Sequence, residues 1–184
     1  AMDAGHSTST PRDYFCYATM LQMNKQGYFP YTPPMTLLRG LRASIDMMNA
    51  EGLDNVFKRH TRLASGVRAA VTAWGLKNCA VDRKWHSDTV TAIRVSENID
   101  ANDVIKTAYY SYGVSLGAGL GPLNGNVFRI GHLGWLNETM VLQALGGVEM
   151  AMRDVGVKFL PGCGVGAAIE KYTDAKAPME LAAE

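Results

Sequence analysis

The chain has 184 residues, of which 18 are Lys or Arg and 17 are Asp or Glu, so its formal net charge is +1. Hydrophobic residues make up 47% and charged residues 19%, a composition typical of folded globular domains rather than disordered chains. The charge balance argues against a dedicated nucleic-acid or membrane-surface binder, since both usually carry a clear basic excess. No apolar run approaches the ~20 residues that a membrane-spanning helix needs.

The N-terminal residues and the cysteines indicate how the protein is processed and where it is located. Residues 1–11 contain no apolar stretch of the kind a secretory signal requires, and we expect residues 1–9 to be a tag remnant or disordered lead-in. Cys16, Cys79 and Cys163 are odd in number and widely spaced, which fits neither a disulfide framework nor a CxxC metal pattern. This use of cysteine predicts a cytoplasmic protein. We also predict no metal site, because the histidines lack metal-ligand spacing.

The first predicted helix follows an aromatic, irregular stretch over residues 10–34, where three prolines within residues 30–34 exclude a helix interior. Thr32 followed by Pro33 predicts its start, since threonine caps helices and proline is tolerated at the first helical position. Glu51 and Gly52 mark its end. Apolar residues spaced by three and four predict one apolar face, made of Leu38, Leu41, Ile45 and Met48.

A second helix is predicted over residues 54–75 after a short connection. Its apolar face carries Val56, His60, Leu63, Val67, Ala70 and Trp74. Alternation over residues 89–95 then predicts a strand with one buried face. A helix capped by Asp100 or Asn102 and ending at Gly113 should follow.

The glycine spacing of the segment Gly117-Ala118-Gly119-Leu120-Gly121 is similar to that of a nucleotide-binding turn. Such a turn must open directly into a helix whose N-terminus holds the phosphate. Here Pro122 and the turn signal Asn124-Gly125 follow instead. The segment therefore predicts a loop between short strands at residues 114–117 and 127–130, and not a nucleotide site.

The remainder predicts one long helix and a less regular end. Asn137 followed by Glu138 starts the helix, and Gly156 stops it. A short helix is expected around residues 167–172, before a loose tail at 175–184. The order of helix pair, strand, helix, two strands and helix is typical of an α+β domain whose helices pack on a small, largely antiparallel sheet.

Arg129 is the residue that most strongly suggests binding chemistry. On a strand over residues 127–130 it shares a face with Val127, among glycine and apolar neighbours where a solvated charge is unexpected. Its guanidinium could form a bidentate pair with a ligand carboxylate. It could equally form a structural salt bridge with a nearby Asp or Glu, and the spacing alone favours neither.

Other candidate site residues have two interpretations each. Tyr28, Tyr31 and Thr32 lie just ahead of a predicted helix N-terminus, which would suit a phosphate or another anion. The same residues suit a capped helix with aromatic packing. His132, between two glycines, is more often a packing or turn residue than a catalyst, and Cys163 is either an exposed thiol or a small residue in a tight turn.

Several separate motifs occur in unbroken order over residues 10–158. They are GYFPYTPP at 27–34, EGLDNV at 51–56, ASGVR at 64–68, GLGPLNG at 119–125 and FRIGHLG at 128–134. This set resembles the C-terminal half of the class V, fold-type-I pyridoxal-phosphate aminotransferases, and within that family the serine–glyoxylate and alanine–glyoxylate branch. The resemblance implies the small C-terminal domain of that fold and transfer of an amino group from serine or alanine to glyoxylate or a similar 2-oxo acid.

The resemblance also implies roles for individual residues. Arg129 matches the arginine that holds the α-carboxylate of the amino-acid or 2-oxo-acid substrate. Thr32 matches a threonine that reaches across a homodimer to the phosphate of pyridoxal 5'-phosphate. A tyrosine shares that contact in relatives, and Tyr28 is the expected match here, although Phe29 stands at the strict offset.

The family's Schiff-base lysine and the aspartate at the pyridinium nitrogen match nothing in this chain. None of its lysines has the Ser-Gln-Lys-type setting, so the resemblance implies that both residues lie upstream and that the chain holds no catalytic residue. Without them the cofactor has neither anchor nor electron sink. We therefore expect the chain to be inactive alone and to be completed by an N-terminal cofactor-binding domain.

The resemblance implies a domain organisation as well. Residues 10–50 would end the large domain and form a linking helix, residues 51–160 would be the small domain, and residues 161–184 a C-terminal extension. Two alternatives stay open. One is a non-catalytic α+β dimerisation or binding module, and the other is a class V lyase such as a cysteine desulfurase, with Cys163 as its thiol.

Overall fold

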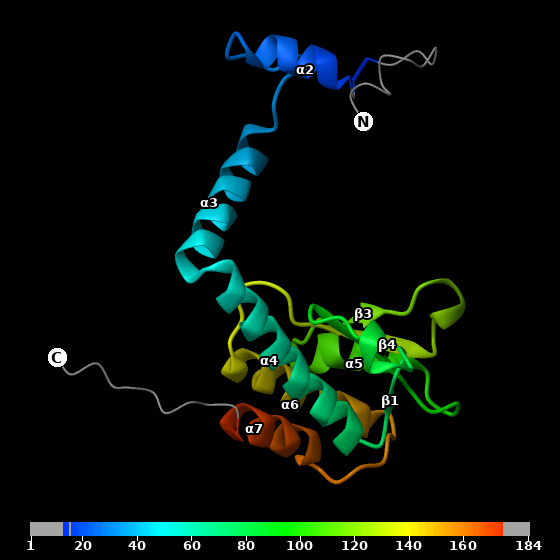
Figure 1. The fold of residues 1–184 in the computed structure, drawn as a ribbon. Helices are drawn as coiled ribbons and strands as arrows, with labels where there is room; N and C mark the ends of the chain where they lie inside the picture. Colours follow the sequence, from blue (N-terminus) through cyan, green and yellow to red (C-terminus); the bar gives the residue numbers. More distant parts are fainter. Residues whose placement is uncertain (1–12, 15, 175–184) are drawn as a thin grey trace, which may run out of the picture. The chain divides into compact units, whose positions relative to one another are not determined.

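The computed structural model describes residues 13, 14 and 16–174, so the expected lead-in at 1–9 and the expected tail at 175–184 lie outside the described residues. Internal contacts divide the chain into two compact units, Ala1–Gly52 and Leu53–Glu184. Figure 1 labels their helices and strands. The first unit holds α2 and α3, and the second holds every later element.

The first unit begins with a helix that the sequence pattern did not predict. α2 spans Tyr17–Asn24, none of its residues is buried, and no side chain caps its N-terminus. A helix of this kind lacks the apolar periodicity and the capping residue by which helices are recognised.

α3 spans Met35–Glu51 with Pro34 at its N-cap position, so the predicted start at Thr32 is wrong. A residue that precedes a proline is disfavoured in the α region, and Thr32 and Pro33 both precede one. The helix therefore begins only after the last proline. Its end at Gly52, where φ is +83°, confirms the predicted stop. Of the predicted apolar face, Leu38 is half-buried and Leu41, Ile45 and Met48 are exposed.

The second unit begins with α4, Leu53–Ala73, which confirms the second predicted helix. Gly75 follows with φ +72°. The predicted apolar face is buried at Val56, His60, Leu63, Val67 and Ala70, and Trp74 just beyond the helix is 3% exposed.

The sheet of the second unit has four antiparallel strands in the order β1-β2-β4-β3. β2 (Val90–Arg94) and β4 (Val127–Gly131) are its long central pair and confirm two predicted strands. The predicted strand at 114–117 is wrong, because β3 is only Gly117–Ala118. The N–H of Val114 instead donates to Ala108 O (2.9 Å), which closes the preceding helix. β1, Lys77–Asn78, is too short to leave a sequence pattern.

Local capping signals fix two of the later helices. α5 spans Ala101–Tyr112, and Asp100 caps it by accepting from the N–H of Asn102 (2.8 Å). α6 spans Glu138–Asp154, and Oδ1 of Asn137 accepts from the N–H of Met140 (3.0 Å). Both caps confirm the predicted starts.

α7 spans Cys163–Asp174, so it starts four residues before the predicted 167. Its cap comes from another helix, because the Glu149 carboxylate on α6 lies at its N-terminus. Oε1 accepts from the indole N–H of Trp74 (2.9 Å). The same oxygen accepts from the N–H groups of Gly164 (2.8 Å) and Val165 (3.1 Å), and Oε2 accepts from Gly162 (2.7 Å). A negative group at this end accepts hydrogen bonds from the free backbone amides and interacts favourably with the positive end of the helix dipole.

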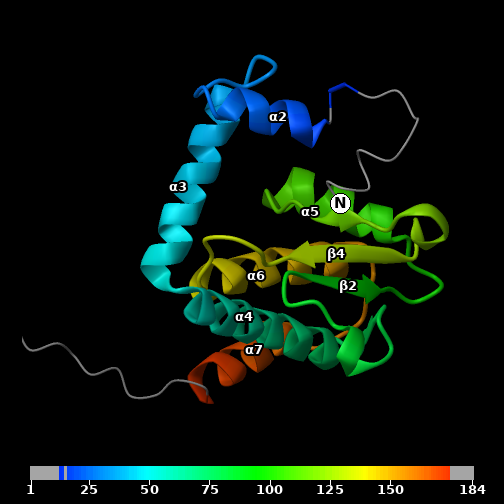
Figure 2. The ribbon, with the colours of Figure 1, turned by 45° about the horizontal axis from the view of Figure 1, so that its top comes forward.

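The core lies between the helices and one face of the sheet. α4 and α7 lie side by side in both views (Figures 1 and 2). Tyr172 on α7 donates to Leu63 O on α4 (2.9 Å), and a Cβ on Gly66 would overlap its ring, so the glycine permits this close approach. Helices α4, α5, α6 and α7 and strands β2 and β4 contribute to the core cluster, through Leu63, Val67, Ile93, Val104, Phe128, Leu145, Val148, Met152, Ala168 and Tyr172 among others.

Candidate functional site

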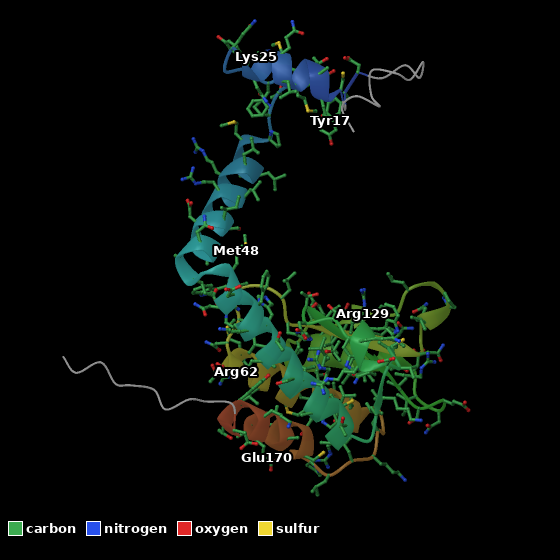
Figure 3. All side chains as sticks on the ribbon, viewed as in Figure 1. Tyr17, Lys25, Met48, Arg62, Arg129 and Glu170 are labelled. Carbon is green, nitrogen blue, oxygen red and sulfur yellow. The ribbon has the colours of Figure 1, made fainter. Side chains whose placement is uncertain are left out.

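Arg129 lies in the middle of β4 (Figure 3). It is on the face of the strand opposite the buried Phe128 and Ile130. Its cross-strand neighbours are Ala92 on β2 and Gly117 on β3. Both neighbours are small, which leaves room for a long side chain between them.

One hydrogen bond holds the guanidinium of Arg129. Its Nε donates to the carbonyl oxygen of Ala118 (3.0 Å), and the side chain is half-buried. Within residues 13, 14 and 16–174 no carboxylate lies at ion-pair distance from Arg129, and its two Nη groups form no hydrogen bond. Among these residues the structural salt bridge is therefore not seen, and a bidentate donor remains for a ligand.

The glycine-rich loop next to Arg129 serves backbone packing. A Cβ on Gly119 would collide with the carbonyl oxygen of Leu123 and would touch that of Val127 at 3.0 Å. The N–H of Gly119 donates to Val127 O (2.9 Å), and Gly125 takes a φ of +76° in the turn. No helix N-terminus opens from these glycines except the short 3-10 turn Gly121–Leu123, which confirms the prediction of a loop.

The predicted phosphate-binding residues belong to the first unit, and Arg129 belongs to the second. Tyr28 is 65% exposed and Thr32 is also exposed. In the described part of the chain neither hydroxyl forms a hydrogen bond, so Thr32 does not cap α3. Tyr31 instead stacks on Tyr14, with ring centroids 4.6 Å apart, so it is the aromatic-packing member of this group.

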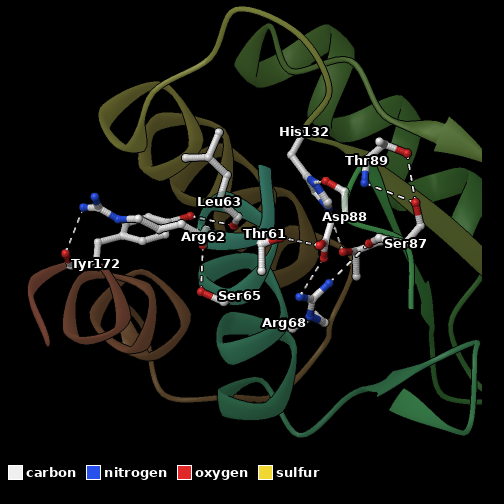
Figure 4. A network of polar contacts seen from close by, with 11 residues as sticks. Thr61, Arg62, Leu63, Ser65, Arg68, Ser87, Asp88, Thr89, His132 and Tyr172 are labelled. Carbon is white, nitrogen blue, oxygen red and sulfur yellow. Dashed lines mark hydrogen bonds and ion pairs between the residues drawn. The ribbon is translucent and has the colours of Figure 1, made fainter. Parts of the chain in front are cut away.

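His132 anchors the chain just after β4 and is fully buried (Figure 4). Its Nδ1 contacts Asp88 O (3.0 Å), and its Nε2 contacts the Thr91 hydroxyl (2.9 Å). Because a carbonyl oxygen only accepts, Nδ1 carries the proton and Nε2 of the neutral ring accepts from Thr91. The histidine is thus a packing residue that fixes the end of β4 against β2.

Asp88 connects this point to α4. Its Oδ2 accepts from the Thr61 hydroxyl (2.6 Å) and its Oδ1 from Nη2 of Arg68 (3.1 Å). Burial opposes ionisation, but the Thr61 and Arg68 hydrogen bonds together hold the pKa of Asp88 below its ordinary value. Thr61 and Arg68 on α4 therefore stabilise the charged Asp88 carboxylate just before β2. The backbone carbonyl of Asp88 in turn holds His132.

Arg59 and His60 of α4 clamp the loop that follows. Nη1 of Arg59 donates to Gly134 O (2.7 Å) and its guanidinium lies 5.6 Å from the ring centroid of Trp135. Nδ1 of His60 contacts Val56 O (2.7 Å), and Nε2 accepts from the N–H of Gly134 (3.1 Å). The strand bearing Arg129 is consequently fixed at its C-terminal end by contacts from α4.

The buried His132 should make the free energy of unfolding depend on pH. Burial lowers the pKa of His132, and the charge of Arg68 adds to that effect against the opposing Asp88 contacts. An unfolded ring titrates near ~6.5 and binds a proton below that pH, whereas the folded ring stays neutral until a lower pH. The unfolded state then binds more protons, so the free energy of unfolding should fall as the pH drops below about 6.5.

Denaturant midpoints measured between pH 7.5 and pH 5.5 test this expectation. His132→Gln should lower stability at every pH and flatten the decline. Asp88 does not interfere, because its lowered pKa moves its own contribution to the acid side of ~3.9. An unchanged decline in the variant would show that another group controls the pH dependence.

Comparisons with known proteins bear directly on these features. No protein-family profile matches the chain. It is 59% identical over 162 residues to serine–glyoxylate aminotransferase of Hyphomicrobium methylovorum, covering 88% of this chain and 40% of that protein. It is 49% identical over 172 residues to L-aspartate–glyoxylate aminotransferase of Paracoccus denitrificans, covering 94% and 43%. The solved pyridoxamine–pyruvate aminotransferase of Mesorhizobium loti is 34% identical with a TM-score of 0.76, over 82% of this chain and 38% of that one.

The chain is homologous to the C-terminal part of the class V aminotransferases. It spans about 40% of the length of the curated relatives it matches. The ureidoglycine–glyoxylate aminotransferase of Bacillus subtilis shares the fold at a TM-score of 0.81 and 24% identity. The predicted α+β class, with helices on a small antiparallel sheet, is confirmed.

Cys163 does not have the setting of a catalytic thiol for a lyase related to the aminotransferases. Its Sγ donates to Ala73 O (3.3 Å). Burial, followed by the negative charge of Glu149, raises the pKa of this thiol. A nucleophilic cysteine needs a lowered pKa, so the geometry disfavours the cysteine desulfurase alternative.

Two further findings concern metals and membranes. Among residues 13, 14 and 16–174, His, Cys, Asp and Glu side chains form no group that could hold a metal ion. Across the same residues, no helix combines the length and apolar character required to cross a bilayer.

Proposed function

We propose that this chain is the C-terminal part of a pyridoxal-phosphate-dependent aminotransferase that moves the amino group of serine, or of alanine, to glyoxylate or a similar 2-oxo acid. The observation that carries the proposal is the Arg129 guanidinium, whose Nη groups form no hydrogen bond in the described residues, within a chain 59% identical to a serine–glyoxylate aminotransferase. Relatives from Methylorubrum extorquens and Arabidopsis thaliana carry the same serine–glyoxylate name, which favours serine as donor.

Arg129 would bind the α-carboxylate that amino-acid and 2-oxo-acid substrates share. Two parallel N–H···O bonds from its Nη groups would hold that carboxylate in one plane and orientation. Holding the substrate in this way removes its rotational freedom before reaction. The contacts of Arg59 and His60 on α4 with the loop after β4 would keep the arginine in place while the small domain closes and excludes water.

Thr32 and Tyr28 would donate to the cofactor phosphate of the partner subunit in a homodimer. The fit rests on donor chemistry, since both hydroxyls are exposed and have no acceptor in the described part of the chain. Pyridoxal 5'-phosphate, when bound, supplies the electron sink and the temporary carrier for the amino group. The lysine and aspartate that handle its reactive end would come from a large domain N-terminal to this chain.

The domain assignment is part of the proposal. Residues 10–50 would complete the large domain and form the linking helix, and residues 51–160 would form the small domain with residues 161–184 as its extension. The division of contacts at Gly52 and Leu53 supports the first boundary. A cytoplasmic location is also proposed, for which the free thiols of Cys79 and Cys163 are the support.

The test is an amino-transfer assay with the full-length protein, glyoxylate, and serine, alanine or aspartate as donor. Glycine should form fastest with serine, and the 184-residue chain alone should form none. Glycine formation from aspartate alone would move the protein to the aspartate–glyoxylate type. Failure with all three donors would refute the proposed activity.

A further inference from the structure

Gly117 lies directly beside the Arg129 side chain. The two residues are paired in register on β3 and β4. A Cβ built on Gly117 would lie 3.1 Å from Nε, 3.3 Å from Cβ and 3.3 Å from Nη2 of Arg129. Gly117 does not have a positive φ, so its backbone would accept any L residue. The space occupied by the guanidinium, and not the backbone conformation, therefore explains the glycine.

The residue after Gly117 supplies the single hydrogen bond that orients the guanidinium. The Ala118 carbonyl accepts from Nε at 3.0 Å. Because a guanidinium is planar, one bond at Nε together with a flat surface beside it restricts the direction of both Nη groups. The opposite neighbour, Ala92, is a small residue too, so the side chain is free to lean toward β3.

We propose that Gly117 is a positioning residue for substrate binding. With the Ala118 carbonyl it forms a rest for the Arg129 guanidinium, so that the two Nη groups meet the substrate α-carboxylate side by side. The inference rests on the proposed carboxylate-binding role of Arg129. It adds that β3, a strand of two residues, determines how well that arginine binds a carboxylate.

A side chain at position 117 would push the guanidinium off this rest. A methyl group at 3.1 Å requires a shift of a few tenths of an ångström, and a valine requires more. Bidentate binding is sensitive to such shifts, since misplacement by ~1 Å can cost about 100-fold in rate. We expect Gly117→Ala to raise the KM for serine about threefold and Gly117→Val about 30-fold, with a smaller change in kcat.

The experiment uses the full-length enzyme with serine and glyoxylate. The matched control is Gly131→Ala, because Gly131 lies on the same face of β4, has no positive φ and has open space where a Cβ would stand. A second readout is the dissociation constant of 2-methylserine, which carries the carboxylate but has no α-proton to lose. Both KM and this constant should rise in the Gly117 variants and stay unchanged in the control.

A double-mutant cycle separates positioning from a structural effect. In an Arg129→Lys background, Gly117→Val should change the KM for serine less than threefold, because lysine has no Nε or Nη2 at this place. An equal 30-fold loss in both backgrounds would mean a merely structural role and would overturn the inference. It is also overturned if both Gly117 variants leave KM unchanged while Arg129→Ala raises it. The proposed function fails in a different way, with Arg129→Ala itself leaving KM unchanged.

Discussion

Arg129→Ala in the full-length enzyme should lower kcat/KM for serine by about 100-fold to 1000-fold, mostly through KM. This corresponds to ~3–4 kcal/mol, within the range for removing one partner of a buried, hydrogen-bonded charge pair. The reason is that no acidic side chain in the described residues pairs with this guanidinium and its Nη groups form no hydrogen bond there, so the substrate carboxylate would lose its main partner. Initial rates over a range of serine concentrations measure the effect.

Two further variants sharpen this test. Arg129→Lys should recover only part of the loss, since an ammonium keeps the charge but cannot form two parallel bonds. Arg153→Ala is the control, because Arg153 is an exposed arginine in the last turn of α6. A KM for serine unchanged by Arg129→Ala would exclude the carboxylate-binding role.

Glu149→Ala should destabilise the second unit on the order of 4 kcal/mol, because it leaves four buried or partly buried N–H donors without this acceptor. These donors are the Trp74 indole and the amides of Gly162, Gly164 and Val165. Glu149 as a whole is only 6% exposed, which limits the access of water to these donors. Chemical denaturation of the full-length protein measures the loss.

Amide hydrogen exchange gives a local measure of the same change. The first turn of α7 should exchange much faster in Glu149→Ala, because its amides lose their acceptor. Glu170→Gln is the control, since Glu170 is an exposed glutamate within α7. Unaltered protection of Gly164 and Val165 in the Glu149 variant would show that the cap contributes little.

The sequence predicted those elements whose signals are local. Asp100 and Asn137 are capping residues that act within three positions, and they placed α5 and α6 correctly. The alternation around Val90 and Val127 likewise predicted β2 and β4. In each case a neighbouring residue satisfies the backbone, so the pattern is readable without the fold.

The predicted starts of α7 and α3 and the predicted strand at 114–117 were wrong. In these places the residue that determines the structure is distant in the sequence, or the element is too short to leave a pattern. The cap of α7 is Glu149, on another helix, and glycines at its start hide the periodicity. The start of α3 depends on Pro34, which disfavours a helical conformation at Pro33. The strand β3 is only two residues long, yet it carries the contact to Arg129.

The candidate site was predictable only in part. The motif around Arg129 suggested a carboxylate ligand, but choosing between a ligand and a salt bridge required the positions of all acidic groups nearby. The role of Asp88 as the link between α4 and His132 has no sequence signature, because its partners lie 27 and 20 residues before it on α4 and 44 residues after it. Such long-range contacts become visible only in the folded chain.

The central claim is that this chain works as the end of a longer aminotransferase. The intact mass of the native protein that carries this sequence, isolated from its source cells, tests that claim most directly. We predict a mass well above the 20.0 kDa of the 184 residues, because the family's lysine and aspartate must precede them. A native mass near 20.0 kDa would contradict the catalytic role and leave a non-catalytic binding or dimerisation module as the function.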